Sequence, residues 1–173
     1  MHAAIRWVPL AALLAAAPMG AASAAPKPAE PFPLFIARDV AGQKQSTATF
    51  RGAPTLVLAI TDRGAGDAMR AWFEGAQKRA PTVRLKGLIS IDVPSFVSDD
   101  FVRARARETI PKTRWHDNLL DTHLGIAQVL SLPESDVPWA FVLDAQGRIV
   151  AAAHAKADAQ AASAVWKSLE AVM

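Results

Sequence analysis

The chain has 173 residues, about the length of one domain, which is enough to bury a hydrophobic core. Its 19 lysines and arginines nearly balance its 16 aspartates and glutamates, so the charge gives no reason to expect binding to nucleic acid. The chain contains no cysteine, which excludes disulfide bonds and every reaction that needs a thiol of this chain.

Residues 1–24 have the pattern of a secretory signal peptide. Arg6 precedes a short apolar run that ends at small residues, so we expect cleavage after Ala24 and export to the bacterial periplasm. The alternative is a membrane anchor, but the run is rich in alanine and shorter than the ~20 strongly apolar residues that a span needs. We expect residues 25–33 to form a proline-rich extended lead-in and residues 34–173 to form one domain.

Strand patterns alternate with a helix pattern in the first half of the domain. Residues 34–42 predict a strand and turn, 46–54 an irregular connection, and the apolar run 55–61 a central strand covered on both faces. A helix follows and ends at Pro81, with one apolar face and a Glu74–Lys78 pair on the other side. That apolar face consists of Met69, Trp72, Phe73 and Ala76. Residues 83–93 predict a second strand.

The second half of the domain predicts further helices and a terminal hairpin. Ser98 is a candidate N-cap for a helix over 98–111, and 115–121 predict a short strand. Thr122 is a candidate cap for the next helix, which buries Leu124 or Ile126 together with Val129 and Leu130. Residues 139–144, 144–147 and 148–155 predict a strand, a hairpin turn and a returning strand. Asp158 is a candidate cap for a last helix with an apolar face at Ala162, Val165, Trp166 and Leu169. This order predicts an α/β fold whose mixed sheet packs between helices.

Four stretches carry a resemblance to a known family: FIARDVAG and FRGAPTLVLAI (35–42 and 50–60), the helix that begins near Gly66, LLDTHLGIAQVLSL (119–132) and VPWAFVLDAQGRIV (137–150). Together they resemble the thioredoxin-like superfamily, in its exported TlpA-like and redoxin (AhpC/TSA-like) branch. The last stretch is the most specific of the four. The resemblance covers about residues 34–172 and implies a central mixed sheet with helices on both faces.

The resemblance also implies a position for a functional site. The Cys-x-x-Cys motif of the family falls at about Arg63–Gly66, where this chain has no cysteine, and Pro138 matches the family's cis-proline. We therefore expect a vacated active site that is reused for binding, formed by Thr61, Asp62, Arg63, Gly64, Gly66, Val137, Pro138 and Trp139. Backbone amides and Arg63 would then hold an anion or a partner's carboxylate. The alternative is a relict turn in which Asp67 caps the helix and Asp62 and Arg63 form a solvated pair.

Other side chains offer weaker candidates. Trp139 either anchors a partner or packs against the first helix beside Trp72, and we favour packing. The histidines at 116, 123 and 154, with Asp117, lack any recognised metal-ligand spacing, so we expect no metal and no cofactor. The basic stretch Arg103–Arg114 either meets an acidic partner or forms a solvated face, which we favour.

The leading functional hypothesis is an exported binding module without thiol-disulfide activity and without catalytic residues. Its expected partner is another periplasmic or envelope protein, with no nucleic acid and no membrane span after signal removal. The alternative is a redoxin-related protein of the oxidoreductase class that acts through a partner's thiols or a bound cofactor. A third hypothesis is an enzyme without a thiol that uses His116, Asp117 or His123.

Overall fold

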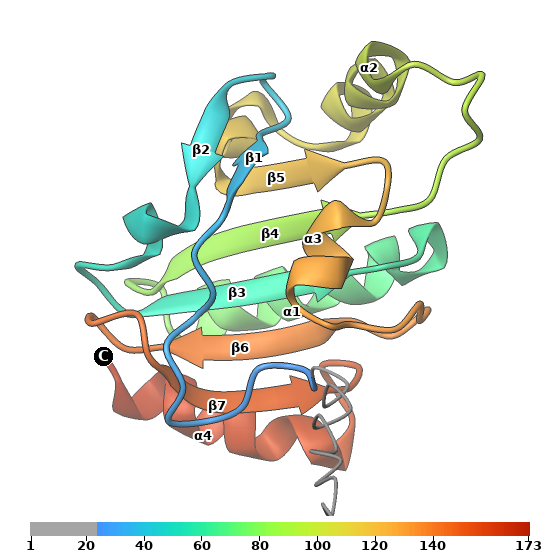
Figure 1. Ribbon diagram of the computed structural model, residues 1–173. Coiled ribbons are helices and arrows are strands. Elements are labelled where there is room, and N and C mark those ends of the chain that lie inside the picture. Colours follow the sequence, from blue (N-terminus) through green and yellow to red (C-terminus); the bar gives the residue numbers. More distant parts are fainter. Residues whose placement is uncertain (1–23) are drawn as a thin grey trace, which may run out of the picture.

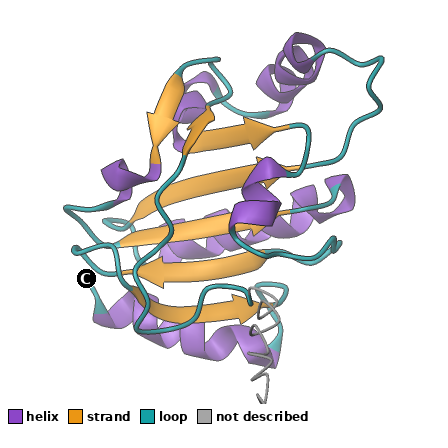
Figure 2. Cartoon of the chain, viewed as in Figure 1, coloured by secondary structure: helices purple, strands orange, loops and turns teal. Residues whose placement is uncertain are grey.

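The computed structural model describes residues 24–173, so the predicted signal peptide lies outside the described residues except for Ala24. Figure 1 shows the arrangement of its strands and helices, and Figure 2 shows the same view by type of secondary structure. The strands are β1 (Ile36–Arg38), β2 (Lys44–Ser46), β3 (Thr55–Ile60), β4 (Arg84–Ser90), β5 (Asn118–Asp121), β6 (Trp139–Leu143) and β7 (Ile149–His154). The α-helices are α1 (Gly66–Arg79), α2 (Asp99–Thr109), α3 (Gly125–Val129) and α4 (Ser163–Ala171).

A five-stranded mixed sheet forms the centre of the domain, with strand order β5-β4-β3-β6-β7. β3, β4 and β5 run parallel, whereas β6 runs antiparallel to both β3 and β7. Every residue of β3 is buried, as the continuous apolar run predicts for a strand with neighbours on both sides and helices on its faces. The predicted α/β class with a central mixed sheet is confirmed.

Two hydrophobic cores lie on opposite faces of this sheet. α1 and α4 cover one face (Figure 1). The rings of Trp72 and Trp166 stack there with centroids 4.4 Å apart. α3 covers the other face together with the N-terminal segment, and Phe32 packs edge-on against Phe141 there. The lead-in 25–33 thus contributes to the core, because Phe32 is buried and Glu30 O accepts a hydrogen bond from Ile149 N. Within residues 24–173 no helix is both long and apolar enough to cross a membrane.

The helix caps differ from several predictions. Ser98 accepts a hydrogen bond from Phe101 N and caps α2 as expected. Asp67 and Asp158 do not cap α1 and α4, because short 3₁₀ turns at 63–65 and 160–162 lead into both helices and place alanines at their N-caps. Thr122 does not cap α3 either. Its hydroxyl donates to Asp99, and the Asp121 carboxylate accepts from Ile126 N instead.

Two smaller predictions are also wrong. Arg70 pairs with Asp67 on α1, and no ion pair joins Glu74 to Lys78 among the residues that the structure describes. The stretch 46–54 is more regular than expected, since a 3₁₀ turn spans Thr47–Phe50 and Ser46 caps it by accepting a hydrogen bond from Ala48 N.

Candidate functional site

The candidate loop follows β3 and leads directly into α1. The Asp62 carboxylate accepts a hydrogen bond from Gly64 N and so caps a 3₁₀ turn over Arg63–Ala65. Arg63 and Gly64 are exposed, and Arg63 donates to Asp92 O at 3.4 Å. The predicted Asp62–Arg63 pair is absent from the described ion pairs, because each side chain bonds to backbone instead.

Thr61 plays a structural part at the base of this loop. Its side chain is buried, its hydroxyl donates to Pro133 O at 2.9 Å, and it accepts from Ser135 N at 2.9 Å. A Cβ built on Gly64 would lie 4.0 Å from Cβ of Asp136, so the loop also lies close to the segment before Pro138. The fold therefore brings the loop and the 133–137 segment together, as the resemblance implies.

The peptide bond before Pro138 is trans, since residues 24–173 contain no cis peptide bond, and the cis-proline implied by the resemblance is wrong. A trans bond is the form that an X-Pro dipeptide prefers. Pro138 is buried, and its carbonyl accepts a hydrogen bond from Ala155 N. The Val137 carbonyl lies 3.1 Å from His154 Nε2, so it is not free beside the start of α1.

Trp139 is packed, but not beside Trp72. Its ring stacks on the exposed His154 ring, with centroids 4.0 Å apart and planes 4° apart. Trp139 is half-buried against the core that contains Phe141, on the opposite face of the sheet from Trp72. Alternate residues of a strand point to opposite faces, and β6 places Trp139 and Phe141 on the α3 side. Among the described residues the indole N–H has no hydrogen-bond partner.

Ser135 and His154 form a hydrogen-bonded pair that sequence reasoning did not identify. Ser135 Oγ lies 2.8 Å from His154 Nε2 and accepts from Val137 N. The same Nε2 also faces the Val137 carbonyl, which can only accept, so we assign the hydrogen to Nε2. A nitrogen that carries its hydrogen cannot take the proton of a serine nucleophile. The pair therefore holds the 135–137 turn against β7 and does not form a catalytic dyad.

A groove of about 1230 Å³ runs from the candidate loop between α1 and α2. Arg63, Gly64 and Gly66 lie at one end of it, and the two helices line it with both apolar and charged side chains. Its floor includes Ile89 and Ile91, at and just beyond the end of β4. Sequence reasoning missed this groove, although the apolar residues at 93–97, just before the predicted helix, were a signal that could have indicated it.

The basic stretch is only partly a solvated face, since Arg105 and Lys112 are exposed whereas Arg103 is buried. Arg103 is only 6% exposed and donates to the carbonyls of Asp39 and Leu120 at 2.9 and 3.4 Å. Arg107 donates to Val40 O at 2.9 Å. These two arginines attach α2 to the 39–40 segment and to β5, and Arg103 is the only buried residue of α2.

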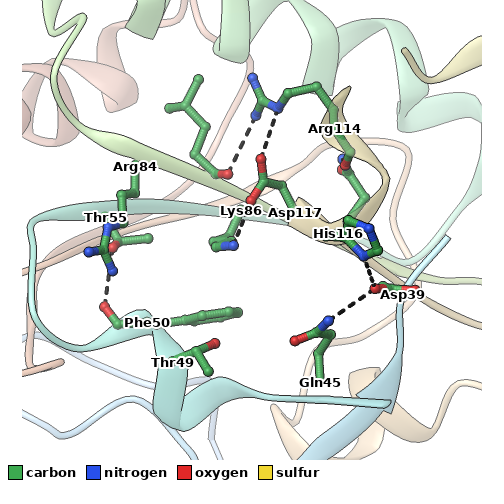
Figure 3. A network of polar contacts seen from close by, with 12 residues as sticks. Asp39, Gln45, Thr49, Phe50, Thr55, Arg84, Lys86, Arg114, His116 and Asp117 are labelled. Carbon is green, nitrogen blue, oxygen red and sulfur yellow. Dashed lines mark hydrogen bonds and ion pairs between the residues drawn. The ribbon is translucent and has the colours of Figure 1, made fainter. Parts of the chain in front are cut away.

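Polar contacts surround the buried Asp39 and the half-buried Asp117 near this attachment (Figure 3). Burial raises the pKa of the Asp39 carboxyl, but hydrogen bonds from His116, Gln43 N and Gln45 outweigh it, so its pKa is lowered. Asp117 lies 2.6 Å from Lys86 Nζ and 3.3 Å from Arg114 Nε. Both carboxylates are thus occupied by protein donors.

The histidines lie apart and contact different partners. His116 binds Asp39, His123 lies 3.7 Å from Asp99, and His154 binds Ser135. Within the part of the chain that the structure describes, no three histidine or carboxylate side chains are grouped as a metal site would require.

Comparisons with known proteins identify a fold. No family model matches this sequence, and no curated protein matches it. Solved structures do match, and those described below are at most 19% identical in sequence. The exposed lipoprotein thioredoxin of Streptococcus pneumoniae is 12% identical, with a TM-score of 0.55 over 80% of this chain and 99% of that chain. The thiol peroxidase of Chromobacterium violaceum is 17% identical, with a TM-score of 0.56 over 86% and 88%.

A third similar structure is a thio-disulfide isomerase from Thermus thermophilus, 19% identical, with a TM-score of 0.56 over 84% of this chain and 96% of that chain. All three similar structures are named for thiol chemistry, whereas the present sequence contains no cysteine. The chain therefore has the thioredoxin-like fold that these proteins share, without a cysteine at the loop after β3.

Proposed function

We propose that this protein is exported and functions by binding a partner, not by thiol-disulfide exchange. The observation that carries this proposal is the loop after β3. It presents the exposed Arg63 and Gly64 at the end of an open groove, in a chain that has no sulfur nucleophile. A fold that can position a reactive group is kept, while the group itself is absent.

The proposed binding surface centres on Arg63 and Gly64, with Gly66 and Val137 beside them. The Asp62 carboxylate fixes the turn of the loop by accepting a hydrogen bond from Gly64 N, and the Thr61 hydroxyl holds the loop against the 133–135 segment. Pro138 and Trp139 contribute through packing, since Pro138 is buried and Trp139 is stacked on His154. The guanidinium of Arg63 suits a carboxylate of another envelope protein.

Export is supported by the sequence of residues 1–24 and tested by locating the protein in cells. Full-length chain expressed in a Gram-negative host should appear in the periplasmic fraction with Ala25 as its first residue, as determined by intact mass. A variant that lacks residues 2–24 should remain in the cytoplasm. Full-length protein that retains Met1 or stays in the cytoplasm would contradict export.

Binding is tested by capture from a periplasmic extract of the source organism, followed by reconstitution of each captured pair from purified components. Arg63→Glu should weaken the reconstituted complex at least tenfold, because it replaces the cation with a repulsive charge. Arg148→Glu, at an exposed arginine outside the groove, is the matched control and should leave the affinity unchanged. If neither substitution changes the affinity, the proposed surface is wrong.

The alternative role, an oxidoreductase that works through a partner's thiols or a bound cofactor, draws on the names of the similar structures alone. Insulin reduction and peroxide consumption by the purified chain distinguish the two roles. A binding module gives the uncatalysed rate in both assays, because thiol exchange requires a thiolate. Turnover by the pure protein would refute the binding proposal.

A further inference from the structure

The two walls of the groove are helices, and each contributes apolar side chains as well as charged ones to its lining. α2 is attached to the domain through Arg103 and Arg107, on its polar side. Its opposite side, with Phe101 and Val102, lines the groove, as do Met69 and Phe73 of α1. Residues at i and i+4 share one side of a helix, so Arg103 and Arg107 lie together on the attached side, whereas Phe101 shares the groove side with Arg105.

Two large aromatic side chains of the groove are exposed to an unusual degree. Phe96, in the segment before α2, is 88% exposed, and Phe101 is 58% exposed. Single apolar residues on a surface need no explanation, but here two phenylalanines border one apolar groove of about 1230 Å³. Pockets for small molecules are of about 300–1,000 Å³, so the groove is large enough for an elongated ligand.

The charges around the groove are distributed unevenly. Seven charged residues line it: Arg63, Asp67, Arg70, Glu74, Arg105, Glu108 and Arg114. Arg70 and Arg105 pair with acids of their own helices, and Arg114 pairs with Asp117. Arg63 has no ion pair among residues 24–173, so it is the arginine that is free to bind an anion. At the Arg63 end the acid Asp67 is paired with Arg70, whereas Glu74, about 12 Å further along the axis of α1, is in no ion pair within residues 24–173, so an anionic group is favoured at the Arg63 end.

The groove suits an acyl chain better than an extended peptide. The strand beneath the groove, β4, is already paired with β3 and β5, so it offers no free edge to the backbone of a peptide. A buried peptide backbone needs partners for its N–H and C=O groups, whereas an alkyl chain needs none.

We propose that this groove binds a long-chain carboxylate, with the carboxylate at Arg63 and the alkyl chain between α1 and α2 along Met69, Phe73 and Phe101. This activity goes beyond the partner binding proposed above. The two share Arg63, but the acyl chain would contact residues that the proposed partner surface does not include.

The test is calorimetric titration of the purified chain with octanoate, decanoate and dodecanoate below their micellar concentrations. Each methylene buried in the groove contributes about 0.8 kcal/mol, so the Kd should fall about fourfold per added methylene. Dodecyltrimethylammonium, which has the same chain and a cationic head, should bind more weakly than dodecanoate. A single site per chain is expected.

Variants locate the site. Phe96→Ser combined with Phe101→Ser should raise the dodecanoate Kd at least tenfold, and both side chains are exposed enough to be replaced without disturbing the core. Leu34→Ser removes an apolar residue outside the groove that is about as exposed as Phe101, and it should have no effect. Arg63→Gln should raise the dodecanoate Kd up to about fivefold and leave the Kd of dodecyltrimethylammonium unchanged.

The proposal is overturned if dodecanoate does not bind with saturation, if its Kd is independent of chain length, or if Leu34→Ser weakens binding as much as the double variant. These outcomes are distinguishable from failure of the partner proposal. The titration uses no partner, and the phenylalanine variants leave Arg63 and Gly64 intact. If the protein still captures its partner but does not bind dodecanoate, only the proposal about the groove ligand is refuted.

Discussion

Replacing Thr61 by valine tests whether one buried hydroxyl holds the candidate loop against the segment before Pro138. The hydroxyl donates to Pro133 O and accepts from Ser135 N, both at 2.9 Å, across more than seventy residues of sequence. Valine keeps the branched shape of threonine and loses both hydrogen bonds, so the change isolates the polar contribution.

The expected destabilisation follows from the burial of the two partners. Ser135 is half-buried, so its N–H loses its bond without full access to water, whereas Pro133 is exposed and its carbonyl is re-solvated. A net hydrogen bond contributes about 0.5–1.5 kcal/mol, and a buried group left unpaired costs about 1–3 kcal/mol. We expect a loss of about 1–2 kcal/mol, which lowers the Tm by about 2–8 °C for a domain of this size.

Thr61→Ser is the matched control, because it keeps the hydroxyl and removes one methyl group, worth about 0.8 kcal/mol. Urea unfolding should rank the stability as wild type, then Thr61→Ser, then Thr61→Val. Hydrogen exchange of the Ser135 amide gives an independent measure: it should be protected in the first two proteins and exchange faster in the third. Full protection in Thr61→Val would show that the hydroxyl does not hold this segment.

Three further substitutions test the packing around the groove and the loop before β2. Arg103→Ala should lower the free energy of unfolding by about 2–3 kcal/mol, as measured by urea titration, since it leaves two carbonyls unpaired and a cavity. The control Arg105→Ala, at an exposed arginine, should lower it by less than about 0.5 kcal/mol. A Cβ on Gly87 would overlap the amide oxygen of Asn118, so Gly87→Ala should lower stability by about 1–3 kcal/mol by thermal unfolding. The lowered pKa of Asp39 means that its carboxylate stabilises the fold above its unfolded pKa of about 3.9, and this contribution is lost as the pH falls through the folded pKa. Asp39→Asn should therefore be less stable than wild type at pH 7, and the difference should shrink below about pH 4; a difference that is constant with pH would contradict this assignment.

The strands were predictable because their signals are local. The structures of the apolar run at 55–61 and of the hairpin around Gly147 are each determined by residues within the segment itself, and both form as expected. Helix starts were less predictable. The 3₁₀ turn over Arg63–Ala65 moves the capping role from Asp67 to Asp62, and no residue pattern in the loop indicated this turn.

The candidate site was only partly predictable, because its contacts join distant parts of the sequence. Three arginines at every second position suited a solvated surface, yet Arg103 is buried since the carbonyls of Asp39 and Leu120 happen to face it. Trp139 was expected to pack beside Trp72, and it packs instead on the opposite face of the sheet. Its neighbour His154 could not be identified, because the pairing of β6 with β7 decides which side chains stack.

The contacts around Pro138 indicate which part of the candidate surface is available for binding. In a site where the carbonyl before this proline is free, a partner can pair its backbone there; here His154 already faces the Val137 carbonyl. Thr61 likewise occupies the neighbouring backbone groups at 133 and 135. These backbone groups on the proline side are thus satisfied within the chain, whereas on the α2 side Arg63 has no ion pair within residues 24–173 and Phe96 is exposed. A ligand or partner of this loop therefore gains most from the groove side, and the effect of Arg63→Glu should exceed that of any substitution at Val137.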